Sequence, residues 1–369
     1  MTPSVVIFRK RLLSYSETFI ADQGLLLPGM QAVFCGFGEN PSGRAMIDNA
    51  PQVLLSEFSP VPALGKLAIR FGLPANRRWL AAIEHYHPKL IHAHFFNDGI
   101  DALQLGGQLE LPVITTLHGH DITKYENAKL AGRRTKSFFE QVDRVIAVSK
   151  FIAEQALARG CPEEKLIQHY IGIDLDRFSQ EKIETDDPSL LFVGRLVEKK
   201  GCTYLLQAME QLESRFPDLR LTIIGEGELK PSLQQEVNSR QLNVEFAGTA
   251  TAAEIRQQLA RSWLFVAPSI TARSGDAEGL GMVFLEAQAL QTPVVSFRSG
   301  GLVEAVDEGT TALLCEEKDV AGLTQNIAQL LEDSSLRRKM GIAGRERVEK
   351  DFDVRRQCAK LESIYAECS

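Results

Sequence analysis

Short apolar runs of strand length alternate with helix-length amphipathic segments along nearly the whole chain, and no other feature constrains the fold as much. In the first half, the strand-like runs lie at residues 4–8, 32–35, 53–55, 90–94, 112–117, 144–148 and 166–170. In the second half, they lie at residues 189–193, 219–224, 244–247, 263–267, 293–297 and 311–314. Alternation of this kind is typical of parallel sheets covered by helices on both faces. The sequence therefore predicts an α/β protein with doubly wound parallel sheets.

A polar stretch, EKIETDDP at residues 181–188, separates the two sets of strands and ends in proline. The chain has 369 residues, which is long enough for two domains with separate cores. We therefore expect a first domain over residues 1–187 and a second over residues 188–352. The segment 353–367 is amphipathic, and we expect residues 353–369 to return to the first domain as a helix.

Composition excludes several classes of protein. The content of 44% hydrophobic and 24% charged residues is ordinary for a soluble globular protein, and the net charge of −7 argues against nucleic acid as a partner. The six cysteines include no C-x-x-C pair, as expected for reduced thiols in the cytoplasm. No signal peptide is recognisable, and no apolar run approaches the ~20 residues that span a bilayer. We therefore expect a cytoplasmic protein.

The stretch at residues 275–301, GDAEGLGMVFLEAQALQTPVVSFRSGG, has the strongest indication of a ligand site. Gly279 and Gly281 open a helix directly after a strand, so the free N–H groups of its first turn favour an anion. Glu278 precedes the helix and Glu286 lies within it, and both carboxylates accept hydrogen bonds from hydroxyl groups. A nucleotide sugar carries both phosphate and hydroxyls. Two glutamates around a glycine loop also fit an ordinary solvated helix start.

A cationic stretch, FVGRLVEKKG, lies about 80 residues before this glycine loop. Arg195 and Lys200 follow a predicted strand and come before a helix. Two cations there could neutralise a pyrophosphate without a metal. Taken alone, the stretch also fits a solvated turn.

All seven histidines lie in the first half of the chain. His118 ends a predicted strand, where it is either a catalytic group or a satisfied core residue. His92 and His94 alternate on one face of another strand, which is a metal-ligand spacing. Further ligands could come from Asp98, Asp101, His118, His120 and Asp121. A metal-dependent hydrolase is therefore the rival interpretation.

The motifs, in their order and spacing, resemble the retaining glycosyltransferases of family 4. In the second half, the matching motifs are FVGRLVEKKG, LTIIGEGEL, VEFAGTA, EGLGMVFLEAQA and PVVSFRSGGLVEAV. In the first half, SETFI, HAHF, TLHGHD, VIAVSKFI and YIGIDLDRF are similar to the branch that builds bacterial exopolysaccharides such as colanic acid. The resemblance implies the GT-B fold, with two Rossmann-like domains facing a cleft and a final helix crossing back to the first domain.

The resemblance also implies roles for matching residues. Arg195 and Lys200 would hold the donor diphosphate, Glu278 would lie near the donor sugar, and His118 would lie near the reacting centre. Glu286 would bind the ribose hydroxyls. The full set implied for the nucleotide sugar is Gly194, Gly225, Glu226, Gly227, Phe246, Gly279, Leu280, Gly281, Met282 and Glu286. The loop at residues 9–17 departs from the family because it lacks glycine, and Ile171 stands where the family often has asparagine.

The reaction implied is transfer of a hexose, with retained configuration, from a UDP- or GDP-linked donor to a hydroxyl of a saccharide acceptor, such as one linked to polyprenyl diphosphate. Neither a cofactor nor a metal is expected. The first domain would bind the acceptor and the second the nucleotide sugar. A non-catalytic sensor of sugar nucleotides is a further alternative.

A basic and apolar face in the first domain is compatible with docking on anionic lipid at the inner membrane. Its basic members are Lys66, Arg70, Arg77, Arg78, Arg133, Arg134 and Lys136. Its apolar members are Leu67, Phe71, Leu73, Trp79, Phe138 and Phe139. The same residues also fit a solvated helix face.

Overall fold

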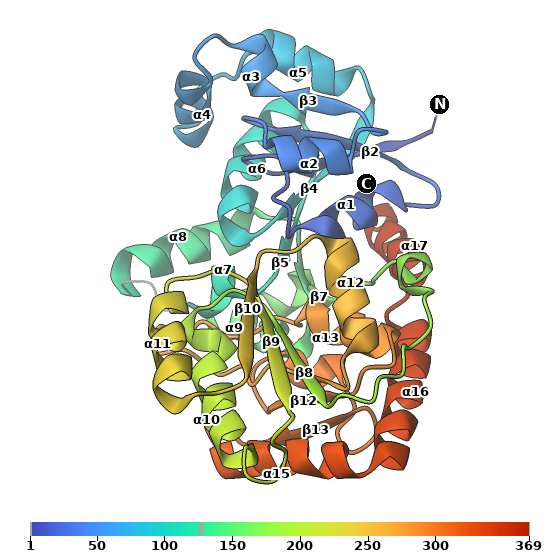
Figure 1. Cartoon of the computed structure of the whole chain (residues 1–369). Helices are drawn as coiled ribbons and strands as arrows, with labels where there is room; N and C mark the ends of the chain where they lie inside the picture. Colours follow the sequence, from blue (N-terminus) through green and yellow to red (C-terminus); the bar gives the residue numbers. More distant parts are fainter. Residues whose placement is uncertain (1, 125–127, 369) are drawn as a thin grey trace. The chain divides into compact units, whose positions relative to one another are not determined.

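The computed structural model describes residues 2–124 and 128–368 (Figure 1). Its contacts divide the chain into two units, one of Met1–Ile173 with Val354–Ser369 and the other of Asp174–Asp353. Each unit has a parallel sheet of its own. The predicted pair of doubly wound α/β domains is therefore confirmed.

In the part of the first unit that the structure describes, a seven-stranded parallel sheet has the order β3-β2-β1-β4-β5-β6-β7. The strands are β1 (Ser4–Phe8), β2 (Gln31–Gly36), β3 (Gln52–Leu54), β4 (Pro88–His94), β5 (Val113–Leu117), β6 (Arg144–Ala147) and β7 (Leu166–Gln168). Every strand predicted in this half is present, with its ends shifted by a few residues at most. The strand order reverses between β1 and β4, which places the carboxyl ends of these two strands at a topological switch point.

The helices of the first unit connect successive strands, except for α17, which returns to this unit after the second one. They are α1 (Thr18–Leu25), α2 (Pro41–Met46), α3 (Leu55–Phe58), α4 (Pro62–Arg70), α5 (Arg77–Glu84), α6 (Phe96–Leu109), α7 (His120–Thr123), α8 (Ala128–Gln141), α9 (Lys150–Ala158), the 3-10 turn η1 (Glu163–Lys165) and α17 (Val354–Ala366). Glu17 takes the N-cap position of α1, and its carboxylate accepts a hydrogen bond from the Ser14 amide at 3.0 Å.

Alternate residues of β1 supply the two faces of the first core. Val5 and Ile7 pack on the face covered by α1 and α17, whereas Val6 and Phe8 pack on the face covered by α5 and α6. All four side chains are buried. A strand covered on both faces is apolar at most positions, which is why these strands appear in the sequence as nearly continuous apolar runs.

In the second unit, a six-stranded parallel sheet has the order β10-β9-β8-β11-β12-β13. The strands are β8 (Ser189–Val193), β9 (Arg220–Ile224), β10 (Val244–Gly248), β11 (Leu264–Val266), β12 (Val294–Phe297) and β13 (Ala312–Cys315). The order reverses between β8 and β11, so this sheet has its own switch point.

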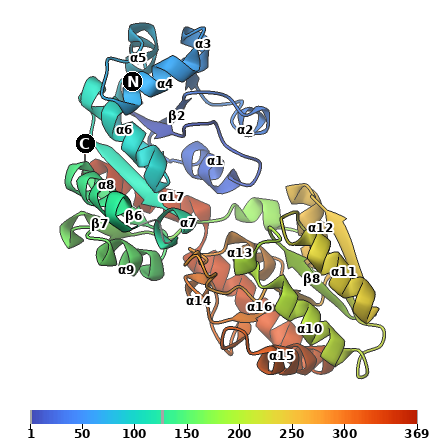
Figure 2. The same ribbon diagram turned by 90° about the vertical axis from the view of Figure 1, so that its left-hand side faces the viewer.

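The helices of the second unit lie on both faces of its sheet. They are η2 (Leu175–Phe178), η3 (Glu198–Lys200), α10 (Cys202–Leu212), α11 (Lys230–Arg240), α12 (Ala252–Arg261), α13 (Met282–Ala289), α14 (Leu302–Ala305), α15 (Val320–Glu332) and α16 (Ser334–Asp351). Figure 1 shows α10 and α11 to one side of β8, with α13 and α16 to the other, and Figure 2 is the view from the side of α10 and α11. Among the described residues, no helix is both long and apolar enough to cross a membrane.

The two units join earlier in the chain than the expected boundary at residue 187. The first unit ends at Ile173, and the polar stretch expected to be a linker packs on the second unit. The Ile183 amide donates to the Ala260 carbonyl at 3.0 Å, and the Trp263 indole donates to the Thr185 carbonyl at 2.9 Å. Polar composition gave no sign of these bonds. The final helix, α17, belongs to the first unit, as expected.

Candidate active site

The residues expected to bind a nucleotide sugar follow β8 and β11, the two strands at the switch point of the second sheet. Gly194, Arg195 and Lys200 come after β8, and Glu278 comes in the segment that joins β11 to α13. Open α/β sheets bind ligands outside the carboxyl ends of the strands at such a point. The topology therefore brings both predicted stretches to the edge of the sheet where a ligand is expected.

Lys200 and Glu278 form an ion pair across this edge. The lysine Nζ lies 2.6 Å from Oε1 of the carboxylate, and the two side chains are 13% and 8% exposed. Burial alone would raise the pKa of Glu278. The charges of Lys200, Lys199 and Arg195 outweigh burial and hold the pKa of Glu278 below its ordinary value. Glu278 is therefore an anion at neutral pH, and Lys200 is held beside it.

The neighbouring cations have different environments. Arg195 is exposed and pairs with no carboxylate in the described ranges, so its guanidinium is available to an anion. Lys199 is buried, and its Nζ lies 2.9 Å from Oδ1 of Asp276. Lys199 therefore fixes the loop that leads to Glu278. Lys199 was not predicted from the sequence, because nothing in two adjacent lysines distinguishes the buried one.

The N-terminus of α13 is shaped by glycine. Gly281 is the N-cap residue with φ +83°, a region that side chains rarely adopt. A Cβ at this position would also lie 2.5 Å from the Phe284 ring. No side chain of the described residues caps the helix. The N-cap residue therefore offers the amides of the first turn no side-chain acceptor, as an anion site requires.

The other expected contacts near α13 differ in exposure. Met282 and Glu286 are partly exposed on the helix, whereas Gly279 and Leu280 are buried in the loop before it. Glu286 thus retains a surface on which a ligand could lie. Gly279 and Leu280 could contact a ligand only through their backbone atoms.

The loops that follow β8, β9 and β10 are held against one another. The Gly194 amide donates to the Ile224 carbonyl at 2.9 Å, and the Gly225 amide donates to the Gly248 carbonyl at 2.7 Å. Gly225 has φ +148°, and a Cβ there would lie 2.0 Å from the Gly194 carbonyl oxygen. Only glycine allows this approach, so the loops form a rigid rim at the sheet edge.

Three further expected residues lie on or near this rim. The Gly227 backbone approaches Leu196 so closely that a Cβ would lie 2.3 Å from the Leu196 carbonyl oxygen. Glu226 is exposed and its carboxylate accepts a hydrogen bond from Lys230 at 2.6 Å. Phe246 is partly exposed on β10, the edge strand of the sheet.

His118 is the expected catalytic residue of the first unit, where it follows β5. Its Nε2 lies 3.0 Å from Nδ1 of His94, and its ring packs on Phe19 and Phe95 at centroid distances of 5.1 and 4.5 Å. Burial, followed by the charge of Arg9, holds the pKa of His118 well below its ordinary value. His118 is therefore a neutral imidazole in a fixed position. His120 is exposed, and the centroid of its ring lies 5.6 Å from that of Phe95.

Comparison with known proteins agrees with the motifs and the topology. Residues 32–177 match the family model described as Glycosyltransferase Family 4, and residues 175–347 match the one described as Glycosyl transferases group 1. A putative colanic acid biosynthesis glycosyltransferase of Salmonella typhimurium is 30% identical over 73% of this chain and 69% of its own length. The amylovoran biosynthesis glycosyltransferase of Erwinia amylovora is 27% identical over 77% of this chain and 72% of its own length.

The chain belongs to glycosyltransferase family 4.

Solved structures agree on the fold of this glycosyltransferase. Anabaena Alr3699/HepE in complex with UDP superposes with a TM-score of 0.79, covers 100% of both chains and is 19% identical. A glycosyltransferase from Rickettsia africae also has a TM-score of 0.79, with 17% identity, over 100% of this chain and 98% of its own. The pair of parallel-sheet units is therefore that of the GT-B fold. Family membership makes the chain an enzyme, so the non-catalytic sensor is not favoured.

The rival metal site is not favoured in this glycosyltransferase. His92 and His94 do share a face, with ring centroids 4.4 Å apart. However, the two ring nitrogens of His92 are engaged by the Tyr365 hydroxyl at 2.6 Å and by the Thr116 hydroxyl at 2.7 Å. Within residues 2–124 and 128–368, no group of three or more His, Cys, Asp or Glu side chains is placed to hold a metal ion.

The acidic residues expected to complete that metal site have other partners. Asp98 accepts hydrogen bonds from the Arg9 side chain and, at 3.1 Å, from the Lys10 amide. Asp101 pairs with Lys10 at 3.2 Å. Asp121 accepts a hydrogen bond from the Gly119 amide at 2.8 Å. These carboxylates therefore fix loops of the first unit.

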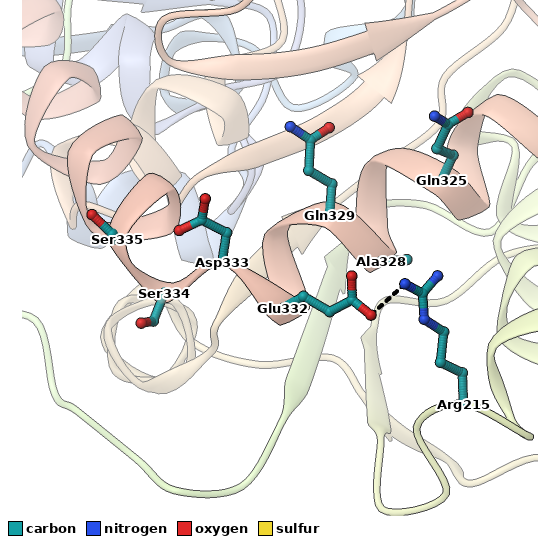
Figure 3. A pocket seen from close by; sticks show the side chains of 8 residues that line it. All are labelled: Arg215, Gln325, Ala328, Gln329, Glu332, Asp333, Ser334 and Ser335. Atoms are coloured by element: carbon teal, nitrogen blue, oxygen red, sulfur yellow. Dashed lines mark ion pairs between the residues drawn. The ribbon is translucent and has the colours of Figure 1, made fainter.

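A pocket of about 570 Å³ lies at the opposite edge of the second sheet from the predicted site (Figure 3). Its lining residues are Arg215, Gln325, Ala328, Gln329, Glu332, Asp333, Ser334 and Ser335. Figure 3 shows the Arg215 guanidinium paired with Glu332, with Gln325 and Gln329 along α15 and Asp333, Ser334 and Ser335 where α15 meets α16. None of the predicted site residues lines this pocket, so its size does not make it the candidate active site.

Proposed function

We propose that this glycosyltransferase transfers a hexose from a UDP- or GDP-linked sugar to a hydroxyl of a lipid-linked saccharide, with retained configuration, during synthesis of a bacterial surface polysaccharide. The observation that carries the donor assignment is the cluster of Arg195, Lys200 and Glu278 beside the N-terminus of α13. Cations and helix amides suit a diphosphate, and a carboxylate suits sugar hydroxyls. The relatives named for colanic acid and amylovoran support the polysaccharide class.

The difficult part of the reaction is departure of the diphosphate. The bond between the sugar C1 and the phosphate oxygen breaks, and negative charge grows on the leaving group. Arg195, Lys200 and the amides of α13 stabilise that charge in positions fixed before the substrate arrives. The acceptor hydroxyl approaches C1 from the face that the phosphate leaves. A new C1–O bond forms there, and the hydroxyl proton passes to the departing phosphate. This proposal needs no metal ion and no resident cofactor.

Binding of the donor is tested by thermal melting in the presence of UDP- and GDP-linked sugars. A ligand that binds only the folded protein stabilises it by ~2.7 kcal/mol at 100 times its Kd, so one donor should raise Tm clearly. Arg195→Ala and Lys200→Ala should each reduce this shift. Arg215→Ala is the matched control, because Arg215 lies at the opposite edge of the same sheet, and it should leave the shift unchanged. Equal shifts in all three variants would contradict the proposed donor site.

Contact with an anionic lipid bilayer is proposed through the α4 surface, which comprises five exposed apolar side chains on and around α4. They are Val61, Leu64, Leu67, Phe71 and Leu73, with exposed fractions of 48, 65, 50, 71 and 54%. Lys66, Arg70, Arg77 and Arg78 are also exposed and pair with no described carboxylate. Residues 59–83 contain these four cations and no acidic residue. Apolar side chains beside cations fit the interface of an anionic bilayer.

The α4 surface differs from the face expected from the sequence. Trp79, Phe138 and Phe139 were expected to contribute, but they are 0, 2 and 1% exposed and belong to the core. Their helical spacing beside basic residues did not distinguish the buried side of α5 and α8 from the exposed side. Arg133, Arg134 and Lys136 are exposed on α8.

Vesicle flotation tests this docking. The protein should float with phosphatidylglycerol vesicles and not with phosphatidylcholine vesicles, and Leu67→Ser with Phe71→Ser should abolish flotation. Leu157→Ser with Ile342→Ser is the control, because these exposed apolar side chains, at 42 and 43%, lie outside the α4 surface. Flotation that does not depend on lipid charge, or that persists when Leu67 and Phe71 are replaced by serine, would rule out docking through the α4 surface.

A further inference from the structure

Two buried histidines lie directly behind His118 in the first unit. His94 is 1% exposed and His92 is 0% exposed, and their ring centroids are 4.4 Å apart. The His94 and His118 rings are stacked with centroids 5.2 Å apart and planes 26° apart. The motif HAHF therefore places one imidazole against His118 and a second imidazole behind the first.

A single hydrogen bond connects the ring of His118 to this stack. It joins His94 Nδ1 and His118 Nε2 at 3.0 Å. Within the described chain, no protein group is hydrogen-bonded to His118 Nδ1. Because His118 is partly exposed, Nδ1 is the ring atom that can meet a substrate hydroxyl.

The backbone of His118 is fixed separately. The Asp121 carboxylate accepts hydrogen bonds from the His118 amide at 3.1 Å and from the Phe96 amide at 3.0 Å. Phe95, which packs on the His118 ring, has φ +71°, a strained conformation for a residue with a side chain. With the backbone held by Asp121, the bond to His94 decides how the ring is turned and where its proton lies.

We propose that His94 is a positioning residue that fixes the orientation and the tautomer of His118, so that His118 presents Nδ1 to a hydroxyl of the bound sugar. This inference rests on the proposed function and on the place near the reacting centre that the family resemblance implies for His118. It adds His94, which touches no substrate, to the residues that determine the rate.

The two tautomers are coupled because one proton lies between the two nitrogens. If His94 Nδ1 carries it, His118 Nε2 accepts and His118 Nδ1 is a donor. If His118 Nε2 carries it, His118 Nδ1 is an acceptor. Burial holds the pKa of both rings well below the ordinary value, so neither gains a second proton at neutral pH. Loss of His94 therefore leaves His118 free to exchange tautomers and to rotate.

Substitutions at His94 separate this role from simple filling of the core. Asparagine places a polar atom where histidine has Nδ1, whereas glutamine places one near Nε2. The bond uses Nδ1, so His94→Asn should preserve the function of His118 and His94→Gln should not. His94→Leu removes the bond altogether. His169→Leu is the matched control, because His169 is a buried histidine bonded through Nε2 to the Gln357 carbonyl, at 2.9 Å.

Two measurements are made on the full-length protein. ¹⁵N NMR of the histidine rings reports the tautomer of His118 without substrate. Steady-state kinetics with the donor found by thermal melting report kcat and KM. We expect His94→Leu and His94→Gln to lower kcat about 10- to 100-fold with donor KM changed less than about threefold, because misplacement of a group by ~1 Å can cost 10²-fold. His94→Asn should keep at least about a third of the wild-type kcat, and His169→Leu should keep all of it.

The outcomes distinguish this inference from the proposed function. Mixed tautomers of His118 in His94→Leu, together with rescue by asparagine alone, support the inference. A single tautomer and an unchanged kcat in His94→Leu overturn it, provided that His118→Ala is inactive. If His118→Ala itself retains wild-type kcat, then the assignment of His118 to the reacting centre fails first. Equal losses in the asparagine and glutamine variants would indicate packing and would also overturn the inference.

Discussion

Removal of the Lys200 side chain should reduce catalysis far more than it reduces folding. In the proposed reaction, Lys200 is one preorganised charge that stabilises the leaving diphosphate, and removal of one such group typically costs about 10²–10³ in kcat. This corresponds to roughly 2.7–4 kcal/mol of transition-state stabilisation. We therefore expect Lys200→Ala to retain less than about 1% of wild-type turnover.

The effect on folding follows from the ion pair with Glu278. Breaking a buried pair by removal of one partner costs about 3–5 kcal/mol when the other charge is left alone. Glu278 is not left alone, because Lys199 and Arg195 also lower its pKa. The loss of unfolding free energy should therefore be about 1–3 kcal/mol, below that range.

The pH dependence has a definite sign. The pKa of Glu278 is lowered in the folded protein, so its contribution to stability is present above the unfolded pKa and is lost as pH falls through the folded pKa. Lys200→Ala reduces the amount by which folding lowers the pKa of Glu278. The variant should therefore lose less stability than the wild type between neutral and acid pH.

The assay is single-turnover transfer with saturating donor, with urea unfolding at neutral and at acid pH measured in parallel. Arg215→Ala serves as the control for loss of a cation from the same unit and should retain full activity. A Lys200→Ala protein that keeps more than half of the wild-type turnover would refute the assigned role. If Lys200→Ala is inactive only because it is globally unfolded, the loss of activity does not support a catalytic role for Lys200.

Three further outcomes are expected. Turnover should persist in excess EDTA, and turnover lost there and restored by zinc would contradict the metal-independent reaction. Gly225→Ala should lower the unfolding free energy by more than the ~1 kcal/mol of an ordinary glycine change. The new Cβ would lie 2.0 Å from the Gly194 carbonyl oxygen, at a residue with φ +148°. A Tm within a degree of wild type would disprove this close approach. Burial lowers the pKa of His92 from 6.5 to about 3, so the folded state excludes a proton that the unfolded chain binds. Stability should fall by about 2 kcal/mol between pH 8 and pH 5 from this group, and His92→Gln should flatten that part of a chemical-denaturation series.

The fold was predictable because buried parallel strands are apolar at most of their positions. All strands expected from apolar runs are present in the two sheets, and the returning helix was visible from its amphipathic spacing. The boundary between the units was not predictable to the same degree. Residues such as Ile183 and Thr185 join the second unit through single backbone and indole hydrogen bonds, which polar composition does not reveal.

The candidate site was predictable at the level of strands and loops, but less so at the level of side chains. Topology alone brings Lys200 and Glu278 to one switch point, because each follows a strand beside the reversal of strand order. Sequence could not show that Lys199 turns into the protein toward Asp276. Nor could it show that His92 is hydrogen-bonded to Tyr365, which lies 273 residues later in the chain.

The return of α17 to the first unit has a consequence for biosynthesis. Tyr365, Leu361, Cys358 and Val354 belong to the same apolar cluster as Val5 and Ile7, yet the whole second unit is encoded between them. The first unit therefore lacks part of this cluster while the 180 intervening residues, Asp174–Asp353, are synthesised. Its core is complete only after α17 has been made.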